Sequence, residues 1–311
     1  MKILLAVDGS ESSMAAVDEA ARTPWPEGSK VRIVTVAEIP LPTMPWTMPV
    51  PGGTYEEFER MFEERSMESA TKAAARFGEI AGSKIDVITK TLKGDPKKAI
   101  LDDAEHWGAD LIVVGTHGYN ALQRFWLGSV SRAVVSNAKC SVQVVRRREG
   151  QSVGEKGMRI LIAVDGSAPS GAAVEEIASR PWSAGSEVRV ISAVHLPFTP
   201  TPETWALPES YYSTVGKIAR EQADLAVNSA ITRLLESNTA REIPMTLSEE
   251  VIVGHAEEVI IEDAKKWGAD LIAVGSHGYS GFERFLLGSV SQAVASHAPC
   301  SVEIVREKSF A

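Results

Sequence analysis

The chain has 311 residues, of which 44% are hydrophobic and 23% are charged, and its formal net charge at pH 7 is -9. This balance is typical of a soluble globular protein, and the length predicts about two domains. The acidic net charge argues against nucleic acid as a partner, because binding to a phosphate backbone needs a basic face. The apolar run at the start of the chain is too short for an export signal or a membrane span, so we expect no membrane partner.

Apolar runs alternate with segments of helical spacing along the first half of the chain. The strands predicted there are 2–7, 31–37, 85–92, 111–114 and 141–145. The predicted helices are 12–22, 55–81, a helix opened by Gly94-Asp95-Pro96 and the segment 129–137. A proline-rich stretch, 40–51, follows the second strand. It forms either a flap over the ligand or a long surface loop.

The second half repeats this order. Strands are predicted at 159–164, 188–194, 245–253, 271–274 and 301–305, and a second proline-rich stretch spans 197–208. When residues 101–146 are aligned with 261–306, about 29 of 46 positions are identical, which indicates domain duplication. Residues 147–157 are polar and lack apolar periodicity, as in a linker. We therefore predict one domain over 1–146 and a second over 158–307.

Strands that alternate with helices and are apolar on both faces predict an α/β fold, with a parallel sheet covered on both sides. Right-handed crossovers make each half a doubly wound sheet. In such sheets ligands bind at the carboxyl ends of the strands, where the strand order reverses. We therefore examine the residues that follow the predicted strands.

A glycine-rich loop follows the fourth strand of each half. It reads Gly115-Thr116-His117-Gly118, nine residues, Gly128-Ser129, and it returns as Gly275-Ser276-His277-Gly278, nine residues, Gly288-Ser289. Glycine allows positive φ and close approach of an anion to the backbone. The hydroxyls of Ser129 and Ser131, with the amides of residues 129–131, lie at a predicted helix N-terminus that favours negative charge. The sequence therefore predicts a phosphate site, and the alternative is a tight turn in which glycine only satisfies geometry.

Two further residue types recur near these loops. Asp8 and Asp165 end the first strand of each half in Val-Asp-Gly-Ser, where a carboxylate can bind ribose hydroxyls or hold Mg²⁺ against phosphates. The alternative is an Asx turn or a helix cap. His117 and His277 either contact the phosphate or bind a neighbouring carbonyl. We expect Gly115→Val and Ser129→Asp to weaken ligand binding without unfolding the protein.

Several other site types have no support in the sequence. There is no metal-ligand cluster and no Ser-His-Asp spacing, and the glycine-rich loop lacks the lysine of a Walker loop. Cys140 and Cys300 hold equivalent places before the last strand of each half, so each is expected to be buried as a thiol. We therefore expect no disulfide and a cytoplasmic location.

The loop spacing Gly-x2-Gly-x9-Gly-Ser after the fourth strand, with Val-Asp-Gly-Ser after the first, resembles the universal stress protein family. Specifically, it resembles the ATP-binding branch in a tandem two-domain form, over nearly the whole chain. The resemblance implies two five-stranded parallel sheets in the order 3-2-1-4-5, similar to the adenine nucleotide alpha hydrolases. It also implies ATP between the ends of strands one and four of each half.

The resemblance also implies which residues bind the nucleotide. In the first half the phosphate ligands are Gly115, Gly118, Gly128, Ser129, Val130 and Ser131, with Asp8 at the ribose and phosphates and the Val36 backbone at the adenine. In the second half the matching residues are Gly275, Gly278, Gly288, Ser289, Val290, Ser291, Asp165 and Ala193. Alanine at position 193 loosens the adenine pocket but keeps a backbone contact.

The function that this resemblance implies is a cytoplasmic, ATP-binding sensor or regulator of the stress response. The alternatives are a slow ATPase or adenylyl-transfer enzyme and a nucleotide-independent, chaperone-like scaffold. The family also pairs domains through their final strands, so 141–145 and 301–305 are expected to pair within one chain. A homodimer of chains is expected in addition.

Overall fold

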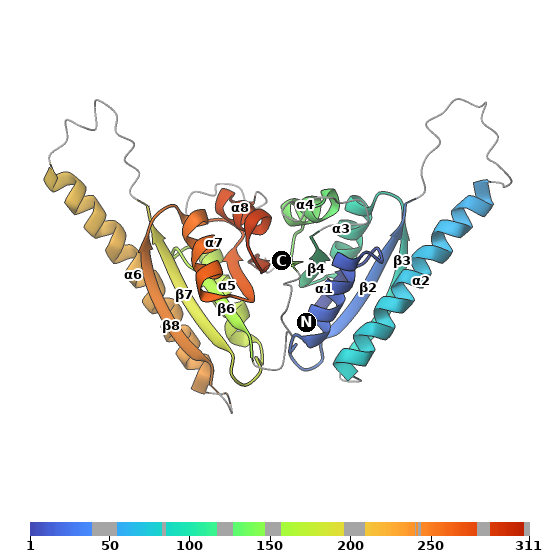
Figure 1. The fold of residues 1–311 in the computed structure, drawn as a ribbon, viewed down its shortest axis with the longest axis horizontal. Coiled ribbons are helices and arrows are strands. Elements are labelled where there is room, and N and C mark those ends of the chain that lie inside the picture. The colour runs from blue at the N-terminus through green and yellow to red at the C-terminus, as the bar shows by residue number, and fades with distance from the viewer. Residues whose placement is uncertain are drawn as a thin grey trace, which may run out of the picture. The chain divides into compact units, whose positions relative to one another are not determined.

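The computed structural model describes residues 1–38, 55–82, 85–116, 127–146, 157–195, 209–239, 241, 244–278 and 287–307. The chain divides into two compact units, Met1–Arg147 and Arg148–Ala311, here called unit 1 and unit 2 (Figure 1). His117, Gly118 and both proline-rich stretches lie outside the described residues. The predicted pairing of the two final strands and the predicted homodimer stay predictions.

Unit 1 contains a five-stranded parallel sheet. Its strands are β1 (Lys2–Ala6), β2 (Lys30–Ala37), β3 (Asp86–Lys93), β4 (Leu111–Gly115) and β5 (Ser141–Val145). They lie in the order β3-β2-β1-β4-β5, which confirms the predicted order. The order reverses between β1 and β4, so the carboxyl ends of these two strands flank the crevice in which a doubly wound sheet binds ligands.

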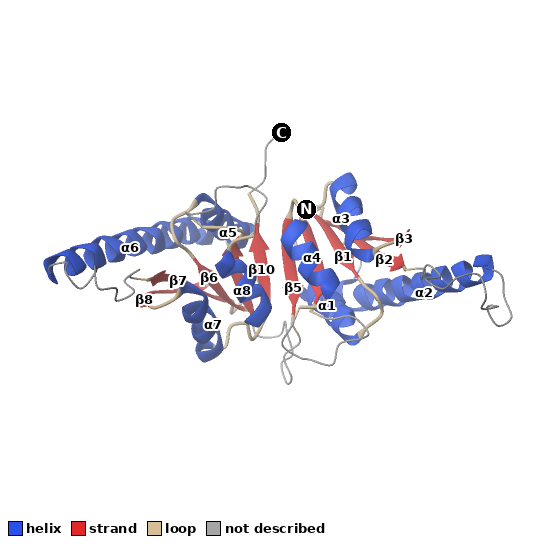
Figure 2. Ribbon diagram, turned by 90° about the horizontal axis from the view of Figure 1, so that it is seen from above, coloured by secondary structure: helices blue, strands red, loops and turns tan. Residues whose placement is uncertain are grey.

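Helices cover both faces of this sheet (Figure 2). They are α1 (Glu11–Arg22), α2 (Tyr55–Ala81), α3 (Pro96–Trp107) and α4 (Ser129–Asn137). Helices α1 and α2 contact each other, as do α3 and α4. The core beneath α1 and α2 contains Ile3, Leu5, Val17, Phe77 and Leu111, all fully buried. Burial on both faces explains why the inner strands are continuous apolar runs.

Unit 2 repeats this architecture. Its strands are β6 (Arg159–Ala163), β7 (Glu187–Val194), β8 (Thr246–Val253), β9 (Leu271–Gly275) and β10 (Ser301–Val305). Its helices are α5 (Ala168–Ser179), α6 (Glu209–Thr239), α7 (Ala256–Trp267) and α8 (Ser289–His297). The parallel sheet has the order β8-β7-β6-β9-β10. The crevice of this unit therefore lies between β6 and β9.

Local signals set the ends of several helices. Ser10 accepts a hydrogen bond from the Ser13 amide, so α1 begins at Glu11, one residue before the predicted start. Pro96 opens α3 as predicted, and Gly108 ends it in the left-handed region at φ 67°. In the part of the chain that the structure describes, no helix is both long enough and apolar enough to span a membrane.

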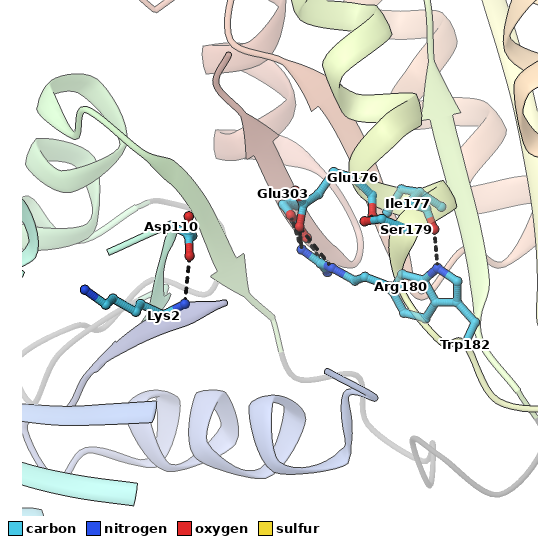
Figure 3. A network of polar contacts seen from close by, with 8 residues as sticks. All are labelled: Lys2, Asp110, Glu176, Ile177, Ser179, Arg180, Trp182 and Glu303. Carbon is cyan, nitrogen blue, oxygen red and sulfur yellow. Dashed lines mark hydrogen bonds and ion pairs between the residues drawn. The ribbon is translucent and has the colours of Figure 1, made fainter. Parts of the chain in front are cut away.

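A buried ionic cluster distinguishes unit 2 from unit 1 (Figure 3). Arg180, which follows α5, donates to both carboxylate oxygens of Glu303 on β10 and also to Glu176. Arg180 and Glu303 are 1% and 0% exposed. We call Arg180, Glu303 and Glu176 the buried triad.

In unit 1 the positions of the buried triad carry less charge. Thr23 stands at the position of Arg180, Gln143 at that of Glu303, and Glu19 at that of Glu176. The Gln143 amide donates to Glu19 at 2.7 Å. In unit 2 an ion cluster therefore holds α5 against β10. In unit 1 a hydrogen bond from an amide holds the equivalent helix, α1, against the equivalent strand, β5.

Candidate functional site

Each glycine-rich loop leads into a short helix whose first turn has no side-chain cap. The N-cap residues are Gly128 for α4 and Gly288 for α8, and neither first turn contains an acidic residue. The Gly128 amide donates to the Thr116 carbonyl at 2.7 Å, and the Gly288 amide donates to the Ser276 carbonyl at 2.8 Å. These bonds hold the start of each helix against the end of the preceding strand. The amides of residues 129–131 and 289–291 have no partner within the helix, so an anion can bind there.

Other helix N-termini are occupied by the protein's own side chains. The N-caps of α1, α3 and α5 all accept a hydrogen bond from an amide of the first turn. Helix α7 begins after His255, which makes no such bond, but Glu257 and Glu258 lie in its first turn and repel an anion. Among the helices whose N-caps are described, α4 and α8 therefore suit an anion best.

The hydroxyls of Ser131 and Ser291 differ from the sequence-based interpretation. Both side chains are buried, and each donates its proton at 2.6 Å to a carbonyl at the end of the preceding strand, that of Gly115 or Gly275. A hydroxyl has one proton to donate, so these hydroxyls are not phosphate donors while the bonds persist. Their role is to fix the helix to the strand, and only their amides remain for a ligand.

Removal of this hydroxyl gives a first test. We expect Ser131→Ala to lower the free energy of unfolding of unit 1 by about 1 kcal/mol, because it removes a buried hydrogen bond. The midpoint of chemical denaturation measures this change. Ser129 is exposed, so Ser129→Ala serves as the control and should leave stability nearly unchanged. Equal stability of the two variants would contradict the role given to Ser131.

The first glycine of each loop is needed for packing against a helix. A Cβ at Gly115 would lie 2.6 Å from the Ser12 carbonyl oxygen, and one at Gly275 would lie 2.6 Å from the Pro169 carbonyl carbon. Gly115, Gly128, Gly275 and Gly288 do not adopt positive φ, so that part of the prediction is wrong for them. The structure argues against the expectation that Gly115→Val leaves the fold intact, because the new side chain would collide with the backbone of α1.

The two aspartates lie at the carboxyl ends of β1 and β6 and form Asx turns. Asp8 Oδ1 accepts from the Ser10 amide at 2.9 Å, and Asp165 Oδ1 accepts from the Ser167 amide at 2.9 Å. The glycine after each aspartate has a φ of 80° or 85°, a conformation that favours glycine. The Asx turn, which the sequence offered as the alternative to a ligand contact, is thus present. It uses Oδ1 of each aspartate and leaves Oδ2 out of the turn.

Asp165 lies directly against Gly278 of the glycine-rich loop of unit 2. A Cβ at Gly278 would lie 2.5 Å from Asp165 Oδ2, so a side chain there would displace the carboxylate. The structure thus brings together two predicted site residues, Asp165 and Gly278, from segments more than 100 positions apart. Sequence reasoning missed the Ser167 hydroxyl, which donates to Asp165 at 2.5 Å. The recurrence of serine two residues after each aspartate was the available signal.

His277 is half-buried, and its ring contacts its own neighbour. Nδ1 lies 3.0 Å from the Ser276 hydroxyl, rather than at a carbonyl as one interpretation of the sequence suggested. A Cβ at Gly288 would come within 3.1 Å of the His277 Cα, so the loop passes close over the start of α8. The equivalent His117 lies outside the described residues.

Val36 and Ala193 present their backbones to the crevices. The Val34 carbonyl accepts from the Val7 amide, and the Ala37 carbonyl accepts from the Gly94 amide on the opposite edge of β2. Because backbone groups of alternate residues point to the same edge of a strand, the amide and carbonyl of Val36 face β1. The β1–β2 pairing ends at Val34, so these groups lie beyond the end of β1.

The same pattern places Ala193 in unit 2. The Ile191 carbonyl accepts from the Val164 amide, and the Val194 carbonyl accepts from the Gly254 amide. The β6–β7 pairing ends at Ile191, two residues before Ala193. Each crevice thus has a backbone donor and acceptor on one side and uncapped helix amides on the other.

A metal site made of protein ligands alone has no support within the described ranges. They contain no group of three or more His, Cys, Asp or Glu side chains that could hold a metal ion. Mg²⁺ commonly binds through one or two carboxylates together with substrate phosphates. The remaining oxygens of Asp8 and Asp165 fit that pattern, in which the ligand itself supplies most of the coordination.

Comparisons with known proteins agree with this architecture. The model of the universal stress protein family matches residues 1–146 and 158–306. A universal stress protein of Mycobacterium tuberculosis is 27% identical over 308 residues, which cover 98% of this chain and 97% of the relative. One of Mycolicibacterium smegmatis is 28% identical over 311 residues, with the same shares covered.

A solved structure has the same fold. A universal stress protein from Archaeoglobus fulgidus has a TM-score of 0.62 and 19% identity, covering 100% of this chain and 97% of that one. The family model matches twice, once in each half of the chain, and the similar mycobacterial proteins extend across both halves. The chain therefore belongs to the universal stress protein family, in a tandem form with one family domain in each half.

Proposed function

We propose that each unit binds an adenine nucleotide, with ATP as the ligand, in the crevice between β1 and β4 or between β6 and β9. One observation carries this proposal. The N-termini of α4 and α8 lack side-chain caps and acidic residues, and each is bonded to the end of the strand that borders the crevice. Such a terminus favours a phosphate group through its free amides and its dipole.

The remaining groups of each crevice suit the other parts of the nucleotide. In unit 1 the phosphates bind the amides of residues 129–131 and the Ser129 hydroxyl. Asp8 binds the ribose, or binds Mg²⁺ against the phosphates, and the Val36 backbone binds the adenine edge. In unit 2 residues 289–291 bind the phosphates, Asp165 binds the ribose or Mg²⁺, and the Ala193 backbone binds the adenine edge. His277 and Gly278 line the phosphate tail, as His117 and Gly118 do in unit 1.

The role that we propose is a cytoplasmic sensor of nucleotide state in the stress response. Apart from the two histidines, the groups assigned to the phosphates are amides, glycines and hydroxyls, which bind charge but do not remove a proton from water. Fast hydrolysis needs a positioned base, and we assign that role to neither histidine, because Nδ1 of His277 lies 3.0 Å from the Ser276 hydroxyl. Slow release of phosphate at saturating ATP is therefore expected, and several turnovers per second would favour an enzyme.

Two solved structures of family members that cover about half of this chain contain nucleotides. One is a universal stress protein in complex with cAMP and the other, from Arabidopsis thaliana, has AMP bound. Both have a TM-score of 0.34 to this chain. Those ligands belong to those proteins. The ATP proposed for this chain rests on the groups of its own crevices and on the resemblance of its loops to the ATP-binding branch of the family.

Calorimetric titration with ATP and Mg²⁺ tests the proposal. We expect two equivalents of ATP to bind, and we expect the free energy of unfolding to rise by about 4 kcal/mol when ligand exceeds its dissociation constant about 1,000-fold. Ser129→Asp and Ser289→Asp should each remove one equivalent, because a carboxylate repels the phosphates. Neither should destabilise its helix, since an acidic residue in a first turn is favourable.

A matched variant controls for the change in charge. Asn137→Asp adds the same charge at the exposed C-terminal end of α4 and should retain both equivalents. An absence of heat with ATP, ADP and AMP would refute nucleotide binding. Binding that survives both Ser129→Asp and Ser289→Asp would refute the assigned site.

A further inference from the structure

Unit 2 contains a cavity of about 450 Å³ between α5 and α6, beside Asp165. The buried side chains of Val164, Val174, Ala226 and Ala230 form part of its apolar lining. Leu225 also lines it and is 70% exposed. Small-molecule sites in proteins have volumes of about 300–1,000 Å³ and are mostly apolar with a few polar groups, so this cavity is of suitable size.

The same place in unit 1 has different side chains. Gly171 of α5 corresponds to Met14 of α1, and Met14 packs against the hydrophobic core of unit 1. A Cβ at Gly171 would meet no atom within 4 Å, so the space that methionine occupies in unit 1 is open in unit 2. Glycine inside a helix costs about 1 kcal/mol relative to alanine, so unit 2 carries a destabilising residue where the cavity opens.

The side chains on the long helix also differ between the units. Leu225 of α6 stands where α2 has Glu68, and Ser229 stands where α2 has Lys72. In unit 1 Glu68 and Lys72 form an ion pair at 2.6 Å. Unit 2 thus replaces two opposite charges with an apolar side chain and a hydroxyl, both of which line the cavity. The change makes the surface less polar next to the opening left by Gly171.

The charges around the cavity indicate what it can accept. Glu175 and Arg233 form an ion pair, with Arg233 Nε 2.5 Å from Glu175 Oε1, so their opposite charges cancel. Asp165 then gives the lining a net charge of about -1, and the Gln222 amide and the Ser229 hydroxyl supply neutral hydrogen-bonding groups. A carboxylate or phosphate at this site would be repelled by Asp165, whereas a cation would be attracted.

We propose that this cavity is a second small-molecule site, present in unit 2, for a ligand with a flat apolar body and a cationic polar end. The apolar body lies against Val174, Ala226 and Leu225, and the cationic end lies beside Asp165. The site differs in chemistry from the crevice between β6 and β9, whose helix amides favour an anion. It is accordingly a separate site from the nucleotide crevice, but the two sites share Asp165, so tryptamine binding is measured in the absence of nucleotide.

Three indole compounds of similar shape and different charge serve as probes. Tryptamine is cationic, 3-methylindole is neutral and indole-3-acetate is anionic at neutral pH. Saturation-transfer NMR and calorimetric titration with the full chain should show one tryptamine bound per chain. We expect tryptamine to bind most tightly and indole-3-acetate about tenfold more weakly or not at all, because of its repulsion by Asp165.

Substitutions at Gly171 distinguish tryptamine binding in the cavity from nonspecific binding elsewhere on the chain. Gly171→Met places in unit 2 the residue that fills the space in unit 1, and it should weaken tryptamine binding at least about tenfold. Gly171→Ala adds only a methyl group into open space and should leave the affinity within about threefold. Both changes raise helix propensity, so lost binding in Gly171→Met cannot be attributed to unfolding.

The outcomes distinguish this site from the nucleotide site. Ser289→Asp should leave tryptamine binding unchanged, and Gly171→Met should leave ATP binding unchanged. No binding of any of the three probes would overturn the proposal. So would equal binding of tryptamine to the natural chain and to Gly171→Met, or tighter binding of indole-3-acetate than of tryptamine.

Discussion

Arg180→Thr is expected to lower the free energy of unfolding of unit 2 by about 3–5 kcal/mol, because it leaves Glu303 as a buried charge without a partner. Arg180 Nη1 donates to Glu303 at 2.8 Å, and Nη2 donates to both Glu303 and Glu176. Without the guanidinium, two carboxylates face each other beneath α5. Denaturant titration of the full chain, monitored by the fluorescence of Trp182, whose ring lies 5.6 Å from the guanidinium, measures the loss.

The same variant should show a change in the pH dependence of stability. Burial raises the pKa of the Glu303 carboxyl, and the Arg180 guanidinium opposes this effect. In Arg180→Thr the opposing charge is gone, so the pKa of the Glu303 carboxyl in the folded state rises further above that in the unfolded chain. The variant is therefore expected to be most stable below the unfolded-state pKa and to lose stability as pH rises through the folded-state value.

Unit 1 supplies the matched control. Arg180→Thr combined with Glu303→Gln gives unit 2 the residues that unit 1 has at Thr23 and Gln143, where the amide donates to a single glutamate. Replacing a whole buried ion pair is far less costly than removing one partner, so the double variant should recover most of the lost stability. Additive losses in the two single variants and the double variant would contradict coupling within the buried triad.

Gly275→Ala is expected to lower the free energy of unfolding of unit 2 by about 1–3 kcal/mol, as overpacking in a fixed core does. Its Cβ would lie 2.6 Å from the Pro169 carbonyl carbon and 2.8 Å from the Ser170 amide nitrogen. These are backbone atoms at the start of α5, so a side-chain rotation cannot relieve the contact. Thermal unfolding of the natural chain and of the variant measures the effect.

Gly171→Ala is the control for this substitution. It adds the same methyl group inside the same unit, where no atom lies within 4 Å, and it should be neutral or stabilising. Unchanged stability in Gly275→Ala would show that α5 can move away from β9. It would also support the expectation made from the sequence for the equivalent Gly115, that its substitution weakens ligand binding without unfolding the protein.

The sequence was sufficient for features that depend on neighbouring residues. Apolar runs, proline at a first turn and serine caps act within a few positions, so the strands of both units and the helices of unit 1 were predicted to within about one residue at most of the predicted ends. Duplication fixed the number of units, and the right-handed crossover rule limited the possible sheets. The glycine-serine pairs likewise indicated where two helices begin without side-chain caps.

Only the tertiary structure decided which partner each polar group takes. The Ser131 hydroxyl binds a carbonyl 16 positions earlier, and Arg180 binds Glu303 across 123 positions. The space opened by Gly171 becomes a cavity because α6, more than 40 residues later, brings Leu225 and Ser229 beside it. A local pattern specifies backbone conformation, but hydrogen bonds, steric contact and burial depend on segments that meet only when the sheet has formed.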